Sequence, residues 1–249
     1  RCVLRLTGTA DAVVRGNYMH HDYFGGWSQG FNLYLEGAPG LLAEHNVIRG
    51  SSWPLQNLEG EFRYNLVVDV GHEWIRTVRS GARIHHNVFT NVTISGKQGI
   101  ETGIWMYQNE SGVQIWNNTF DGGGTLMGFA APAIAVSAGA KIASLRNNLF
   151  MGIVPPSGRA VVGRNMGETD GSPRVDYADY NAFAMAGDHY GDGLVGGKTE
   201  GGNGFGGHDL GGGKDMGIEP KLESPTVLPY PIREGDVWAG RTSTMQVLS

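Results

Sequence analysis

Short runs of alternating apolar and polar residues recur along the chain and follow one template. Each copy contains an asparagine, with an apolar residue three places before it in most copies and an apolar residue two places after it. The copies are VVRGNYM (13–19), LAEHNVI (42–48), EFRYNLV (61–67), RIHHNVF (83–89), QIWNNTF (114–120), SLRNNLF (144–150) and DYADYNAF (176–183). A repeat of about 20 to 30 residues indicates a chain built from stacked units.

A second set of short strand-like stretches lies between several of these copies and ends in Gly or Ser turn residues. The stretches are FNLYLE (31–36), EWIRTV (73–78), GIWMYQ (103–108) and AIAVSA (133–138). A unit of two or three short strands cannot pair its own backbone, whereas units stacked at ~4.8 Å pair with one another and bury a continuous interior. The pattern therefore predicts an all-β parallel solenoid.

Two columns of side chains follow from this stacking. The asparagines, at intervals of 19 to 33 residues, are expected to share amide hydrogen bonds in a ladder, as stacked amides do in cross-β structures. They are Asn17, Asn46, Asn65, Asn87, Asn118, Asn148 and Asn181. The apolar residues two places later are expected to stack inward, and they are Met19, Ile48, Val67, Phe89, Phe120, Phe150 and Phe183.

With this repeat the sequence resembles the right-handed parallel β-helix proteins of the pectate-lyase-like group, whose motif is similar to I-x-x-N-x-F. The resemblance covers about residues 12–185 and implies a right-handed parallel β-helix of about seven coils. It leaves the activity open, because that group holds polysaccharide lyases, glycoside hydrolases, uronate epimerases, phage tailspikes and noncatalytic adhesins.

The repeat stops near Ala186, and we expect one domain with three parts. Residues 1–186 form the coils, and residues 187–217, with 14 glycines in 31 positions, form a long loop. Residues 218–249 pack back along the helix as extended chain, since four prolines in that segment oppose a central strand. The first residue is not Met and the start has no signal-peptide layout, which we interpret as a piece of a longer chain.

Composition narrows the function classes. The chain has 41 glycines among 249 residues, which suits short strands and tight turns. Its net charge of −5 and scattered arginines give no footprint for nucleic acid. The single cysteine, Cys2, excludes an internal disulfide and a cysteine-based zinc site, and no apolar run reaches 18 residues, so no membrane span is expected.

The adjacent histidines His85 and His86 are interpreted as structural residues. Strand alternation places His85 in an outward column and turns His86 inward, toward the asparagine ladder. The outward column contains Arg15, Glu44, Arg63, His85, Trp116 and Arg146; the inward one contains Gly16, His45, Tyr64, His86, Asn117, Asn147 and Tyr180. A zinc site needs three or four converging ligands, and neighbours on a strand point to opposite faces, so the pair does not satisfy the needs of a zinc site.

The second strand set carries aromatic and charged residues on its expected outer face. With Leu33, Ile75, Ile104 and Ile134 inward, one outward column holds Tyr34, Arg76, Trp105 and Ala135, and the next holds Glu36, Val78, Tyr107 and Ser137. Such a face suits pyranose rings, which stack on aromatics while their hydroxyls bond to charged groups. The candidate substrate-binding residues are Tyr34, Glu36, Trp74, Glu101 and Trp105; alternatively, a loop covers this face.

Candidate chemistry follows from the resemblance, because the lyases and epimerases of that group remove a proton beside a uronate carboxylate. That reaction needs a cation, for which Arg76 is the candidate, and a proton-transfer group, either His72 or Tyr107. Glu73 or Asp69 would orient the histidine. A hydrolase would instead need two carboxylates ~5–9.5 Å apart, for which Glu36, Glu73 and Glu101 come into question.

No metal site and no cofactor are firmly predicted, and calcium is left open. His20 and Asp22 supply only two ligands on one face. The aspartates Asp188, Asp192, Asp209 and Asp215 lie among glycines without a calcium-binding nonapeptide repeat.

The leading hypothesis is an extracellular or cell-surface domain that binds or processes polysaccharide, most plausibly acidic polysaccharide, with lyase or epimerase chemistry as its enzymatic form. The competing hypothesis is a noncatalytic structural or adhesive segment of a larger cell-surface or phage-fibre protein, with further coils or domains of its parent chain as partners. Bare strand edges at the ends of such a helix would require caps or flanking coils in either case.

Overall fold

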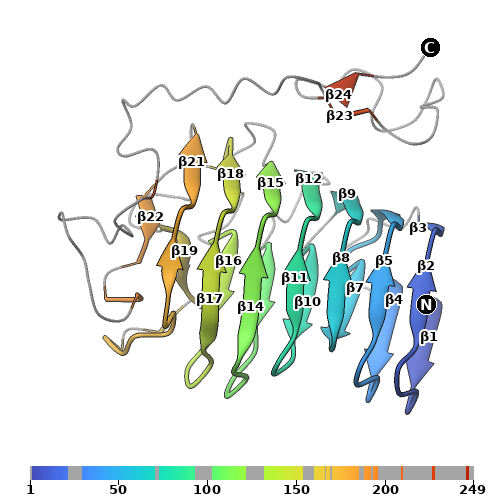
Figure 1. Cartoon of the computed structure of the whole chain (residues 1–249), viewed down its shortest axis with the longest axis horizontal. Coiled ribbons are helices and arrows are strands. Elements are labelled where there is room, and N and C mark those ends of the chain that lie inside the picture. The colour runs from blue at the N-terminus through green and yellow to red at the C-terminus, as the bar shows by residue number, and fades with distance from the viewer. Residues whose placement is uncertain are drawn as a thin grey trace.

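The computed structural model of the chain describes residues 2–21, 30–70, 73–92, 103–121, 132–153, 160–165, 167–168, 170–184, 188–191, 193–195, 209, 226–227 and 245–246. Within these residues the protein is an all-β, right-handed parallel β-helix without α-helices. Successive coils stack along the long axis of the molecule, from β1 at the N-terminal end to β22 (Figure 1). The predicted fold is therefore confirmed.

The first of three sheets has eight strands, each hydrogen-bonded in parallel to the strand of the next coil. In order they are β1 (Cys2–Thr7), β4 (Phe31–Glu36), β7 (Leu55–Leu58), β10 (Ile75–Val78), β13 (Ile104–Met106), β16 (Ile134–Val136), β19 (Ala160–Arg164) and β22 (Asp188–Tyr190). Strand β7 was not predicted from the sequence. It belongs to the shortest repeat interval, which left little room for a second strand signal.

The second and third sheets have seven strands each. The second contains β2 (Val13–Arg15), β5 (Leu42–Glu44), β8 (Glu61–Arg63), β11 (Arg83–His85), β14 (Val113–Trp116), β17 (Ile142–Arg146) and β20 (Ala178–Asp179). The third contains β3 (Tyr18–His21), β6 (Val47–Gly50), β9 (Leu66–Val70), β12 (Val88–Val92), β15 (Thr119–Asp121), β18 (Leu149–Met151) and β21 (Ala182–Ala184). Outside these sheets, β23 (Thr226–Val227) pairs with β24 (Met245–Gln246).

The interior of the helix is a set of aligned apolar columns. In the third sheet the register places Met19, Ile48, Val67, Phe89, Phe120, Phe150 and Phe183 in one buried column, as predicted. The four phenylalanine rings are stacked, with centroids 4.9–5.0 Å apart. Burying such a side chain contributes ~1.5–3 kcal/mol, so the column is a main source of stability.

The asparagine ladder runs along the corner between the second and third sheets. Asn65 shows the pattern: its backbone N–H and its Nδ2 both donate to Oδ1 of Asn87, at 2.9 and 3.1 Å. Its Nδ2 also donates to the carbonyl oxygens of Arg63 and Ala43. Equivalent bonds link Asn17 through Asn181, which confirms the predicted ladder.

The residue before each asparagine turns outward, contrary to our prediction. Every member of this column has a left-handed backbone and is exposed: Gly16 (φ 68°), His45 (55°), Tyr64 (53°), His86 (54°), Asn117 (54°), Asn147 (53°) and Tyr180 (58°). Strand alternation does not apply through such a residue, because the backbone bends sharply there. We refer to this column as the left-handed corner.

The second sheet carries the predicted outward column. Its register aligns Arg15, Glu44, Arg63, His85, Trp116 and Arg146 from coil to coil. Glu44 pairs with Arg15 and Arg63, and the hydrogen bond from Arg63 is the main cause that lowers the pKa of Glu44. Arg15, Glu44 and Arg63 are thus linked to one another across three coils.

The predicted boundaries near residues 186 and 217 lie outside the described residues, as does most of the glycine-rich and C-terminal segments. Among the residues that the structure describes, no helix has the length and apolar character needed to cross a membrane.

Candidate functional site

The regular stacking of the first sheet is interrupted in β7 and β10. Asn57 and Thr77, which lie opposite one another in these strands, both have a left-handed backbone, with φ of 57° and 68°. In β10 the register shifts between Ile75 and Val78, so that one extra residue is accommodated. Such a bulge re-aims the neighbouring side chains. It also turns Val78 into the core, where our prediction had it facing outward.

A groove of about 360 Å³ lies on the outer face at this interruption. It is lined by Gln56, Asn57, Arg76, Thr77, Arg79, Trp105 and Tyr107, from β7, β10, β13 and the residues that follow β10 and β13. Three of the predicted site residues, Arg76, Trp105 and Tyr107, therefore come together. We call this the bulge groove.

Arg76 is held by an aromatic stack. Its guanidinium carbon lies 3.9 Å from the ring centroid of Trp53, within the range of a cation–π contact. Trp53 is buried, and Phe31 stacks against it at 5.7 Å between ring centroids. This contact restricts the Arg76 guanidinium. Among the contacts of the described residues, its N–H groups have no carboxylate partner.

Trp105 and Tyr107 form the aromatic part of the groove. Their ring centroids lie 5.4 Å apart in an edge-to-face arrangement. Trp105 Nε1 donates to Ser137 Oγ at 2.9 Å, which fixes the indole against the next coil. Tyr107 is 42 % exposed. One ring is thus anchored and half-buried while the other is open to solvent.

A second hollow of about 500 Å³ adjoins the bulge groove and shares Asn57 and Arg79 with it. Arg79 donates to Glu110 Oε1 at 2.9 Å and to Asn57 Oδ1 at 3.3 Å. The hollow also contains Glu36 and Glu59, so its lining is more acidic than that of the bulge groove.

Glu110 is kept ionised by its neighbours. Burial alone would raise the pKa of Glu110, but hydrogen bonds from Ser80 and Arg79 outweigh burial and lower it below its ordinary value. Arg79 is consequently already paired, whereas Arg76 presents its charge in the groove.

Two predicted site residues are buried instead of exposed. Trp74 has no exposed surface, and its ring packs against Phe89 and Phe120 at 5.7 and 5.8 Å. A Cβ at Gly103 would lie 2.4 Å from the Trp74 ring, so the glycine of the next coil makes room for it. Trp74 therefore does not line the groove, because its side chain is directed into the core. Glu73 is buried too and does not line the groove.

The other predicted residues lie apart from the bulge groove. Tyr34 is two coils from Arg76 in the same sheet, and the guanidinium of Arg5 lies 5.1 Å from its ring. Glu36 pairs with Arg5 at 2.5 Å and lines the adjoining hollow. Asp69 belongs to β9 in the third sheet, a different sheet from the groove. His72 and Glu101 lie outside the described residues.

Sequence reasoning missed Gln56, Asn57, Thr77 and Arg79. The first two belong to the unpredicted strand β7. Thr77 gave no signal, since β-branched residues rarely adopt a left-handed backbone. The available sign of a bulge was the asparagine within the strand sequence LQNL, because asparagine tolerates a left-handed backbone.

The described residues contain no group of three or more histidine, cysteine, aspartate or glutamate side chains suited to a metal. Of the aspartates considered for calcium, Asp209 instead ends the asparagine ladder. Its Oδ1 accepts from the backbone N–H of Asn181 at 2.6 Å, and its Oδ2 accepts from the Tyr190 hydroxyl at 2.8 Å.

Comparisons of the chain with protein-family models, with curated proteins and with solved structures found no match.

Proposed function

We propose that the bulge groove binds an acidic polysaccharide. The observation that carries the proposal is the juxtaposition of Arg76, whose charge has no carboxylate partner among the described contacts, with the anchored Trp105 and the open Tyr107. Sugar rings stack on aromatic faces, and guanidinium groups bind carboxylates through two parallel hydrogen bonds. A sugar that carries a carboxylate meets both requirements in one unit.

The architecture also suits a linear ligand. The groove crosses three coils, and the adjoining hollow extends it through the shared residues Asn57 and Arg79. Gln56 and Asn57 add amide groups that can donate to and accept from sugar hydroxyls. A chain of sugars would thus lie along successive strands, with its carboxylate at Arg76 in the bulge groove.

Lyase or epimerase chemistry is the enzymatic form of this proposal. Both reactions begin with removal of the proton beside a uronate carboxylate, and Arg76 would stabilise the charge that develops on that group. Tyr107 and His72 are the proton-transfer candidates. The similarity of the asparagine repeat to that of the pectate-lyase-like group supports this chemistry. An extracellular or cell-surface location follows, because acidic polysaccharides occur there.

The test is a panel of uronate-containing and neutral glycans offered to the whole chain. Calorimetry measures binding, and ultraviolet absorbance follows the unsaturated product of elimination. We expect binding of uronate glycans that is lost in Arg76→Ala and weakened in Arg76→Lys, because lysine cannot form the planar bidentate contact. Tyr107→Phe should keep binding and lose turnover.

Arg5→Ala is the matched control, since Arg5 is also outward-facing in the first sheet and also contacts an aromatic ring. It should leave glycan binding unchanged. The proposal would be refuted if neutral and acidic glycans bound with equal affinity. It would also be refuted if Arg76→Ala and Arg5→Ala lost glycan binding equally. Binding without turnover would favour an adhesive role over an enzymatic one.

A further inference from the structure

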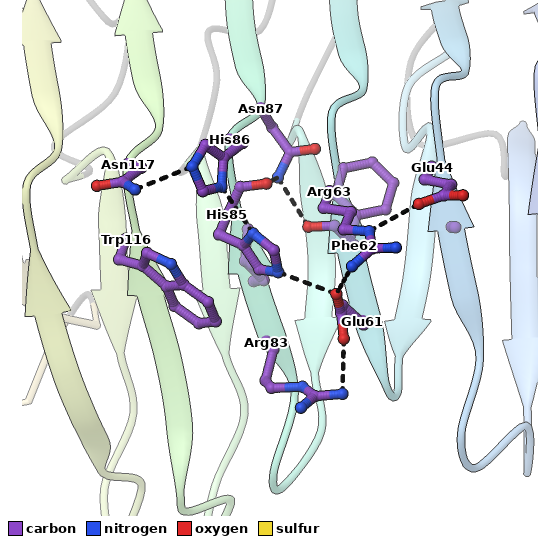
Figure 2. A network of polar contacts seen from close by, with 12 residues as sticks. Glu44, Glu61, Phe62, Arg63, Arg83, His85, His86, Asn87, Trp116 and Asn117 are labelled. Carbon is purple, nitrogen blue, oxygen red and sulfur yellow. Dashed lines mark hydrogen bonds and ion pairs between the residues drawn. The ribbon is translucent and has the colours of Figure 1, made fainter.

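The histidine pair on the second sheet has a geometry that strand alternation did not predict. His86 belongs to the left-handed corner, with φ of 54°, and this bend brings its side chain to the same outer side as His85. The two Nδ1 atoms lie 2.8 Å apart and face one another (Figure 2). One ground on which a zinc site was dismissed from the sequence, that the two side chains point to opposite faces, therefore does not hold.

The remaining nitrogen of each ring also has a partner. His85 Nε2 lies 3.1 Å from Glu61 Oε1, and His86 Nε2 lies 3.0 Å from the side-chain nitrogen of Asn117. His85 is stacked on Trp116 with ring centroids 4.1 Å apart. Figure 2 shows the pair between Glu61 on one side and Asn117 on the other. Both rings are held before any ligand arrives.

One proton arrangement satisfies these contacts in the metal-free protein. A carboxylate only accepts, so His85 donates through Nε2–H to Glu61 and keeps a lone pair on Nδ1. His86 then donates its Nδ1–H to that lone pair, and its own Nε2 accepts from Asn117. A single proton thus lies between the two Nδ1 atoms.

We propose that His85 and His86 bind a divalent copper ion through their two Nδ1 atoms, in place of this shared proton. With metal–nitrogen bonds of ~2.0 Å, nitrogens 2.8 Å apart subtend an angle of about 90° at the metal. That is the angle between neighbouring ligands in a tetragonal complex, which Cu(II) and Ni(II) favour. Tetrahedral zinc would need the nitrogens about 3.3 Å apart at that bond length.

The proton balance of this step is closed. The proton on His86 Nδ1 is released to solvent, and another is taken up at Nε2, so that the ring stays neutral. Asn117 then turns its side-chain amide by half a rotation and presents Oδ1 to the new Nε2–H, since the two ends of an amide have nearly the same shape. Both rings would then donate to an outer acceptor, as metal-bound histidines do.

The surrounding charges set the character of the site. Arg63 and Arg83 both pair with Glu61, at 2.7 and 2.6 Å, and Arg63 also pairs with Glu44. The positive charges of Arg63 and Arg83 repel a metal cation. The affinity for the metal must therefore come from coordination by the imidazole nitrogens and not from a negatively charged surface. That favours copper, which stands highest among the divalent metals for nitrogen ligands. Two protein ligands leave the other positions open to water or to a donor from a ligand.

The experiment uses the whole chain in a Cys2→Ser background, because the exposed thiol of Cys2 is itself a copper ligand. Cu(II) alone is titrated by calorimetry, and electron paramagnetic resonance counts the bound nitrogens. We expect an equivalent of Cu(II) to bind to the parent protein with two nitrogen ligands. This bound copper should disappear in His86→Asn. Asparagine occupies the same left-handed position in Asn117 and Asn147, so this variant should keep the fold.

Two further variants decide the interpretation. Glu61→Gln should weaken copper binding ~10–100-fold, as loss of an outer partner does. His45→Asn removes a histidine from the left-handed corner that has no histidine beside it, and it should leave the equivalent intact. Retention of the two-nitrogen signal in His86→Asn, its loss in His45→Asn, or its absence in the parent protein would overturn the proposal. Copper held elsewhere would persist in His86→Asn.

Discussion

The asparagine ladder and the bulged part of the first sheet belong to the same coils, but the ladder is regular and the bulged part is not. In the asparagine ladder each asparagine from Asn17 to Asn148 donates to Oδ1 of the next through its backbone N–H and its Nδ2, and the phenylalanines beside the ladder stack in register. In the first sheet Asn57 and Thr77 interrupt the repeat in two neighbouring coils. The groove lies at the interruption.

This difference separates stability from binding within one repeat. In the asparagine ladder the side-chain amides bond to one another and to backbone carbonyls, so their polar groups are already used. An inserted residue breaks that exchange, and the side chains beside it turn toward solvent. Arg76 makes a cation–π contact with an aromatic ring. Among the described residues it is not paired with a carboxylate of its own column. Substitutions in the two regions should therefore affect different properties.

The largest effect is expected from Phe120→Ala, in the middle of the phenylalanine column. Removing this ring between Phe89 and Phe150 leaves a cavity in a close-packed interior, and such changes cost about 4 kcal/mol in the free energy of unfolding. Urea unfolding followed by circular dichroism measures the loss. Trp105→Ala, from the preceding first-sheet strand, should cost far less and should abolish glycan binding. Similar losses of stability in both variants would contradict the comparison.

Asn87→Ala should come next, with a loss of about 3 kcal/mol, because several buried backbone and side-chain groups lose their partner at once. Asn87 bonds to Asn65, Asn118 and the carbonyl oxygens of Phe62 and His85. Asn17→Ala, at the end of the ladder with a partner on one side, provides the matched control. The two unfolding curves should differ clearly in midpoint; coincident curves would show that the ladder contributes little.

Thr77→Gly should increase stability by about 1 kcal/mol. A β-branched residue with positive φ carries strain that glycine does not. Asn57→Gly should change stability little, because asparagine already tolerates the left-handed backbone. Thermal unfolding compares the two variants, and calorimetry with uronate glycans shows whether relief of the strain weakens binding. A destabilised Thr77→Gly would mean that the threonine side chain is needed to form the bulge.

The smallest effect near neutral pH concerns the end of the ladder. Burial, and then the charge of Asp209, raise the pKa of Tyr190 well above its ordinary value. The folded state therefore favours the neutral phenol. This contribution to stability is complete below a pH of about 10, the ordinary pKa of tyrosine, and is lost as the pH rises further.

Unfolding midpoints from neutral to strongly alkaline pH measure this dependence. Tyr190→Phe should be less stable at neutral pH, since Asn181 and Asp209 lose a partner, and it should show a weaker alkaline decline. An unchanged decline in the variant would assign it to other groups.

The parts of the fold that were predictable from the chain are those that repeat. The spacing of Asn17 to Asn181 and the apolar residue two places after each asparagine predicted the coil, the ladder and the phenylalanine column. Register in a stacked solenoid is a property of the repeat itself, because a slip of one residue would turn the buried column outward. Arg76, Trp105 and Tyr107 were reachable by the same alternation.

The tertiary structure decided the positions at which the backbone leaves the strand conformation. Alternation predicted Val78 facing outward and His86 facing inward, and both predictions were wrong; Trp74, a candidate for substrate binding, is buried in the core. A bulge at Thr77, a bend at Trp74 and a left-handed corner at His86 each set the side on which a side chain emerges. These bends depend on how neighbouring coils pack, which no single repeat encodes, and the bulge groove and the histidine pair both lie at such bends.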